Sequence, residues 1–198
     1  DSEDSTVPGW SLNTVTFTDA IGATNSIYTI TVGAKNKEGG SAVFQGTVVV
    51  GNQVRVYGGN NSNESGLVEF QAGLTAPLIN LQDNTGVSTA TFNATNGAVT
   101  FAGTVFGHSA GDGTLNAIDD DADAAPDAIT FSGQIGSTQL GALTVGSSTQ
   151  GGSAIFTSTS GVTVATVTVT GGDNAAEDSV AEFQDSLTAT SVTLDDNT

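Results

Sequence analysis

The chain has 198 residues, of which 37% are hydrophobic, so it can build a sizeable core without disulfide or metal staples. It has 21 acidic residues and only three basic ones, Lys35, Lys37 and Arg55, so the net charge is −18. This charge repels nucleic acid and anionic lipid, so we exclude both as partners. Cys and Met are absent, which excludes disulfides and thiolate metal sites and fits exposure outside a cell.

The first ten residues are interpreted as an acidic N-terminal segment. The chain starts at Asp1 rather than at Met, so we expect a processed mature form or a piece of a longer protein. No apolar run approaches the length of a transmembrane helix, which argues against membrane insertion. Trp10, beside Pro8, is a candidate docking anchor, because a large aromatic ring supplies much contact area.

The most informative feature is an internal repeat. Residues 66–85 and 179–198 match at ten of twenty positions and lie 113 residues apart. Nearly the same displacement relates residues 39–44 to 151–156. Self-similarity at a fixed period is typical of repeat architectures. We therefore predict a tandem repeat of about 113 residues.

The repeat divides the chain into a first β-repeat unit at 11–124 and a second, incomplete unit at 125–198. The first unit continues through residues 86–124 beyond the point that matches the last residue of the second. An unpaired strand edge readily pairs with another strand. We expect the missing strands to come from a neighbouring subunit or from the rest of a longer polypeptide.

A shorter rhythm runs inside each unit. Phe residues recur about every 22 to 27 positions within a unit, and each is expected to begin a strand. They are Phe44, Phe70 and Phe92 in the first unit and Phe131, Phe156 and Phe183 in the second. An aliphatic strand is expected between successive Phe strands. Val and Ile alternate with Thr and Ser, as in pleated strands, while Gly, Asn and Asp mark the turns. Helical periodicity is nearly absent, so we expect little or no helix.

This pattern predicts an all-β fold. Repeats that alternate inward aliphatic or aromatic residues with outward Thr and Ser suit a β-solenoid of the parallel β-helix type, in which each coil buries its face on the next. A row of tandem β-sandwich domains is the alternative, because its strands alternate in the same way.

Three segments, residues 42–51, 129–146 and 181–198, resemble repeats of giant bacterial surface proteins. Autotransporter and filamentous-haemagglutinin-like adhesins carry similar repeats, as do surface-layer and extracellular filament proteins. The resemblance lies in composition and rhythm and covers most of the chain. It implies a right-handed parallel β-helix that is exported to the cell surface.

One segment concentrates acidic residues between two strand-forming regions. Six aspartates fall within sixteen positions: Asp112, Asp119, Asp120, Asp121, Asp123 and Asp127. Calcium prefers six to eight oxygen ligands, but the spacing does not match an EF-hand loop. The segment is either an irregular or shared calcium site or a solvated acidic loop.

Catalytic chemistry has little support. The single histidine, His108, lies in a Gly-rich segment, and no nucleophile signature accompanies it. Carboxylates are abundant, but none stands in an apolar stretch that would raise its pKa. We therefore expect a protein that is not an enzyme.

These observations favour a secreted structural subunit of an extracellular filament, surface layer or matrix fibre. It would form a homopolymer through β-strand contacts, with calcium as a stabilising ion. The residues expected to carry assembly are Val15, Phe17, Val192 and Leu194 in the terminal strands, together with Trp10. The alternative is the stalk segment of a cell-surface adhesin whose tip binds cell-surface glycans, which predicts a monomer.

Overall fold

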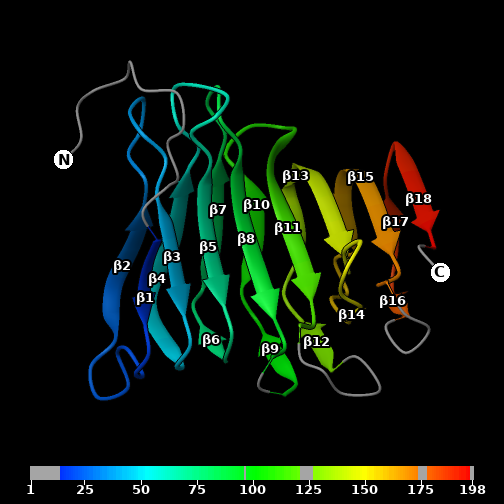
Figure 1. Cartoon of the computed structure of the whole chain (residues 1–198), viewed down its shortest axis with the longest axis horizontal. Coiled ribbons are helices and arrows are strands. Elements are labelled where there is room, and N and C mark those ends of the chain that lie inside the picture. Colours follow the sequence, from blue (N-terminus) through cyan, green and yellow to red (C-terminus); the bar gives the residue numbers. More distant parts are fainter. Residues whose placement is uncertain (1–13, 96, 121–126, 174–177, 197–198) are drawn as a thin grey trace.

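The protein is a parallel β-solenoid of about seven turns in a computed structural model that describes residues 14–95, 97–120, 127–173 and 178–196 (Figure 1). These residues form β-strands and no helix. Every strand pair among them is parallel, whereas β-sandwiches are antiparallel. The solenoid prediction is confirmed, and the tandem-sandwich alternative is wrong.

Each turn of the chain runs along three faces, which we number 1 to 3 in the order in which the chain meets them. Face 1 is the longest ladder, with eight stacked strands. They are β1 (Thr14–Phe17), β3 (Ser41–Phe44), β5 (Gly66–Phe70), β8 (Ser88–Asn93), β11 (Asp112–Ile118), the second part of β13 (Ile135–Val145), the second part of β15 (Val162–Thr170) and β18 (Ser191–Asp195).

Faces 2 and 3 close the coil. Face 2 begins with short pairings of Ile21, β4 (Val48–Tyr57) and β6 (Leu74–Thr75), and continues as a sheet of β9 (Val99–Phe101), β12 (Ala128–Phe131), β14 (Gly152–Phe156) and β16 (Ser179–Phe183). Face 3 holds β2 (Ile27–Val32), the second part of β4, β7 (Leu78–Gln82), β10 (Thr104–Gly107), the first parts of β13 and β15, and β17 (Leu187–Thr188).

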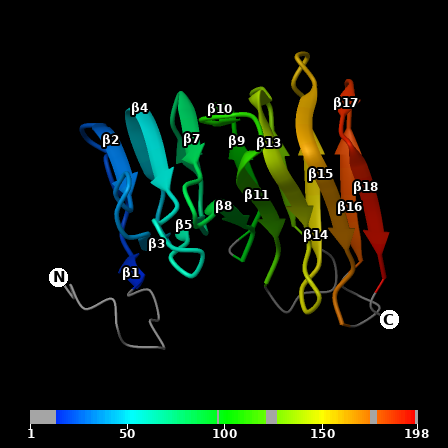
Figure 2. The ribbon, with the colours of Figure 1, turned by 90° about the horizontal axis from the view of Figure 1, so that it is seen from above.

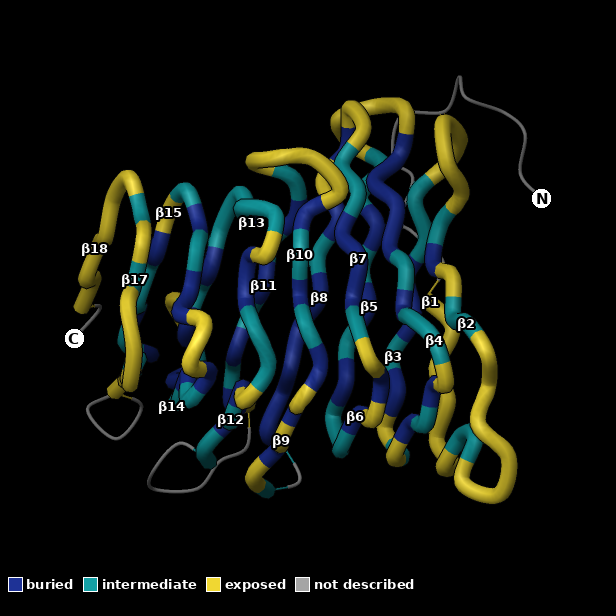
Figure 3. The backbone as a smooth tube through the Cα atoms, turned by 180° about the vertical axis from the view of Figure 1, so that it is seen from behind, coloured by how far each residue is buried: buried dark blue, intermediate teal, exposed yellow. Residues whose placement is uncertain are grey.

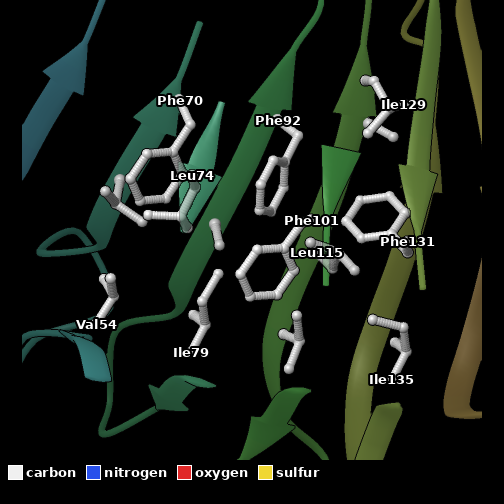
Figure 4. Packing of buried hydrophobic residues seen from close by; sticks show 14 of the residues in the cluster. Val54, Phe70, Leu74, Ile79, Phe92, Phe101, Leu115, Ile129, Phe131 and Ile135 are labelled. Atoms are coloured by element: carbon white, nitrogen blue, oxygen red, sulfur yellow. The ribbon is translucent and has the colours of Figure 1, made fainter. Parts of the chain in front are cut away.

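The core fills the space between the three faces because alternate residues of each strand point inward. Eight of the nine phenylalanines form one internal aromatic ladder, in which the centroids of contacting rings are 4.9–5.5 Å apart: Phe17, Phe44, Phe70, Phe92, Phe101, Phe131, Phe156 and Phe183. Figure 4 shows the middle of this core. In the register of β3, β5 and β14, each Phe ends its strand, so the expectation that it begins the strand is wrong.

The repeat does not return to the same face. Phe17, Phe44, Phe70 and Phe92 stack on face 1, whereas the ladder from Phe101 through the second half of the chain lies on face 2. The change occurs where two Phe strands, β8 and β9, follow each other directly on consecutive faces. The second half is therefore built like the first but is turned by one face, about a third of a turn, around the solenoid axis.

The longest loops shift in the same way. In the first half they join face 3 to face 1, as at residues 33–40 and 58–65. In the second half they join face 1 to face 2, as at residues 146–151 and between β15 and β16. Acidic residues of the second half therefore lie at the corner between faces 1 and 2. Two of the three basic residues, Lys35 and Lys37, lie instead in the first coil, in the turn after β2.

Candidate functional site

The first coil leaves core-type side chains open to solvent. Val15 and Phe17 of β1 point inward, because they continue the rows of Ala42 and Phe44 on β3. Yet Val15 is 54% exposed and Phe17 is 39% exposed, since no described strand pairs with the outer edge of β1. The ring of Phe17 stacks on Phe44 at 4.9 Å with its other face uncovered by the ladder.

The last coil repeats this arrangement at the opposite end of the solenoid (Figure 3). Val192 and Leu194 of β18 continue the inward rows of Val167 and Val169 on β15, yet they are 56% and 78% exposed. Within the described residues, β18 pairs with β15 alone. The four strand residues predicted for assembly therefore lie on two open coil ends, while Trp10 lies outside the described residues.

A nearby valine provides a useful contrast. Val180 of β16 is also 56% exposed, but it pairs with Ser153 and alternates with the inward residue Ala181. It therefore points away from the core, on the outer surface of the coil. Val192 continues an inward row and is exposed because no described strand covers the outer edge of β18, whereas Val180 is exposed because it points outward.

Additional residues complete the two end coils. Ile21 and Ile30 of the first coil, and Leu187 of the last, are partly buried hydrophobic side chains packed against the core. The repeat and the Phe rhythm did not predict a role for these three residues. The match of residues 30–33 to 143–146 identifies Ile30 as an inward residue, because Leu143 is fully buried.

The predicted acidic cluster is divided by the fold. Asp112 begins β11, at the corner between faces 3 and 1, and Asp119 and Asp120 follow the end of the same strand. Asp119 is seven positions after Asp112 along an extended strand, which separates the two groups by about 20 Å, so Asp112 does not belong with the others. Asp121 and Asp123 lie outside the described residues.

The acids that remain together hold the corner between faces 1 and 2. Asp119 is buried, its Oδ2 accepts a hydrogen bond from the Asp127 N–H at 2.5 Å, and its own N–H donates to the Gly151 carbonyl at 3.0 Å. Asp120 accepts a hydrogen bond from the Thr95 hydroxyl. These contacts give Asp119 and Asp120 a structural role in tying successive coils together.

Asp112 belongs to a different polar group with Asp83. Asp83 accepts hydrogen bonds from the Ser88 N–H and hydroxyl, both at 2.6 Å, and from the Gly113 N–H at 2.9 Å. Burial is the main cause that raises the pKa of Asp112; the negative charge of Asp83 adds to it, and the Ser109 N–H donated to Asp112 opposes it. Asp83 thus joins three coils at the corner between faces 3 and 1.

The calcium site predicted from the six aspartates stays a prediction. In the described ranges, no three acidic or histidine side chains gather into a metal-binding group. Calcium at Asp119, Asp120 and Asp127 would need further oxygens from elsewhere.

The histidine and the three basic residues all lie within the described part of the chain. His108 is exposed in the loop before β11, and its N–H donates to the Leu81 carbonyl at 2.8 Å. Arg55 on face 3 contacts the Tyr57 hydroxyl at 3.1 Å. Lys35 and Lys37 are exposed in the turn after β2. The part of the chain that the structure describes holds no helix suited to crossing a membrane.

Comparisons with protein-family models, curated proteins and solved structures find no match to this chain. The two open coil ends, with the exposed inward residues Val15, Phe17, Val192 and Leu194, are therefore the candidate functional feature of this chain.

Proposed function

We propose that the protein is a structural subunit of an extracellular filament, surface layer or matrix fibre, which assembles by stacking the last coil of one copy on the first coil of the next. The observation that carries the proposal is the exposure of inward-facing apolar residues at both ends, Val15 and Phe17 at one and Val192 and Leu194 at the other. Solenoid repeats need a cap or a neighbour to cover such residues.

The strand edges support the same function. Parallel pairing continues from β1 to β18 along face 1, and the outer edges of both strands present backbone N–H and C=O groups in a matching parallel direction. Edge strands of this kind template pairing with another chain. A contact between two different ends of identical copies is heterologous, and such contacts propagate into filaments.

Calcium enters the proposal as a stabilising ion. The net charge of −18 makes copies repel one another, and the acidic corner between faces 1 and 2 concentrates part of this charge. A divalent cation bound near Asp119, Asp120 and Asp127 would reduce the repulsion and use the oxygen ligands that calcium prefers.

The first experiment is electron microscopy of the purified protein with millimolar calcium, without it, and after addition of a chelator. Regular filaments or sheets are expected, and calcium is supported when chelation dissolves them. Monomers under all three conditions would contradict the structural function and favour the adhesin-stalk alternative.

Two valines make this test specific to the coil ends. Val192→Asp places a charge on an inward row at the open end and should abolish polymers. Val180→Asp introduces the same charge at equal exposure on the outer surface and should polymerise normally. Both variants should retain the far-ultraviolet circular dichroism spectrum of the monomer, because both side chains are already half exposed. Equal loss of polymer in the two variants would refute a specific role of the inward row of β18 in assembly.

A further inference from the structure

We infer that successive copies stack with a rotation of one face, so that β1 of one copy pairs with β16 of its neighbour rather than with β18. This inference rests on the proposed function, because it specifies how the polymer is built. Three features of the chain support it: the stagger of the coil ends, the aromatic ladder and the position of the charges.

The stagger of the last coil favours the rotated arrangement. The chain meets faces 2, 3 and 1 in the order β16, β17 and β18 (Figure 2). The next position along the same path is on face 2, above β16. Placing β1 there lets all three faces of the new copy pair at the normal strand spacing of about 4.8 Å. Placing β1 above β18 leaves faces 2 and 3 one coil short of pairing.

The aromatic ladder favours the same arrangement. Phe183 ends β16 and stacks on Phe156 at 4.9 Å, nearly parallel. Phe17 in the first coil stacks on Phe44 in the same way, with ring centroids 4.9 Å apart and the rings nearly parallel. With β1 above β16, Phe17 continues the ladder directly on Phe183. With β1 above β18, Phe17 meets Leu194 instead and the ladder is broken.

The remaining inward residues also match. In the rotated arrangement Ile30 and Val32 of β2 lie above Val192 and Leu194 of β18, following the register that joins β2 to β4 and β15 to β18. Ile30 corresponds in the repeat to Leu143, which already occupies that row on face 1 inside the chain. The chain therefore contains its own example of this stacking.

The charges provide a separate argument. Lys35 and Lys37 are exposed in the turn after β2. Rotation by one face brings this turn to the corner between faces 1 and 2 of the neighbour, where Asp178 and Asp195 are exposed. Without rotation, the turn lies above residues 189–190, which carry no charge. In a chain of net charge −18, a contact that brings two of its three basic residues near exposed carboxylates favours the rotated arrangement.

Cysteine cross-linking distinguishes the two arrangements, because the chain has no native cysteine. Thr16 and Glu182 are outward residues that become in-register neighbours only with rotation, whereas Thr16 and Thr193 become neighbours only without it. In-register parallel residues are about 4.8 Å apart, within the range that a disulfide bridges. Thr16→Cys protein is therefore mixed with Glu182→Cys protein, or with Thr193→Cys protein as the matched control, and oxidised with diamide after assembly.

The expected result is a disulfide-linked dimer in the first mixture and only the background of the single variants in the second. Filaments that cross-link through Thr16→Cys and Thr193→Cys would overturn the rotation and leave the proposed function intact. Absence of any polymer would instead contradict the proposed function, and the inference with it.

The filament geometry provides a second readout. Eight strands stack on face 1, so the rotated arrangement advances about seven and a third coil spacings per copy, on the order of 35 Å along the axis. The unrotated arrangement advances about eight spacings, on the order of 38 Å. An axial rise of about 35 Å with a turn of about 120° in helical reconstruction supports the inference, and a rise of about 38 Å without that turn refutes it.

Discussion

Replacing Phe131 with alanine tests whether the aromatic ladder holds the two halves of the solenoid together. Phe131 is fully buried on β12. Its ring stacks on Phe156 at 5.1 Å and meets Phe92 edge-on at 5.1 Å, so it links the face 1 ladder to the face 2 ladder (Figure 4). Truncation of a buried Phe costs about 3–5 kcal/mol, and each aromatic pair contributes about 0.5–1.5 kcal/mol.

Phe131→Ala should therefore lower the free energy of unfolding by about 3–5 kcal/mol, and Phe131→Leu, which keeps most of the volume, by about 1–3 kcal/mol. The control is Phe106→Ala, because Phe106 is a half-buried residue outside the ladder, with an expected loss of about 1 kcal/mol or less. Urea unfolding followed by circular dichroism measures all three variants. A loss for Phe131→Ala no larger than that for Phe106→Ala would refute the ladder as the main link.

Three further predictions concern the turns and corners. Gly136 and Gly111 both have positive φ, 77° and 93°, but a Cβ on Gly136 would lie 1.8 Å from the Thr163 carbonyl oxygen, whereas a Cβ on Gly111 would meet no atom within 4 Å. In urea unfolding, Gly136→Ala should lower the free energy of unfolding by about 3 kcal/mol or more and Gly111→Ala by about 1–2 kcal/mol. Equal losses in the two variants would contradict the close approach at Gly136. Asp83→Ala removes the acceptor of three hydrogen bonds and should cost about 1.5–3 kcal/mol, measured by the same method; a loss under about 0.5 kcal/mol would show that the corner does not depend on it. Burial raises the pKa of Asp112 above 3.8, so the folded state binds the Asp112 proton more tightly than the unfolded state does, and the contribution of Asp112 to stability falls as pH rises through the raised pKa. The free energy of unfolding of Asp112→Asn should therefore increase relative to that of the parent as pH rises from pH 3.5 to pH 7. A difference between the two proteins that does not change with pH would refute this assignment.

The general architecture follows from local patterns in the sequence. Alternation of Val, Ile and Phe with Thr and Ser determines pleated strands, because successive side chains point to opposite sides of a strand. Recurrence of Phe every coil predicts a repeating stack. Gly, Asn and Asp mark the turns, and residues 34–38 after β2 form a tight turn with Asn36 at φ 56°, a conformation that Asn tolerates better than most residues.

The candidate site was predictable in part. The terminal strands with Val15, Phe17, Val192 and Leu194 follow from the incomplete repeat, and the structure places them on open coil ends. Proximity along the chain was misleading for the acidic residues. Asp112 and Asp119 are seven positions apart, but an extended strand carries them to opposite corners, whereas the same spacing in a loop would allow them to share a cation.

The sequence by itself determined the strands, the turns and the existence of a repeat, because these depend on side-chain alternation and on residues that favour or forbid a backbone conformation. Only the tertiary structure decided that the strands pair in parallel, since alternation is the same in a sandwich. The tertiary structure alone also decided that the second half is turned by one face relative to the first at β8 and β9. The sequence does not predict this rotation, because it depends on how many strands complete one coil. Phe92, Phe101 and Phe131 meet across that shift although they come from different faces, and this contact between faces is a property of the closed coil rather than of any local pattern.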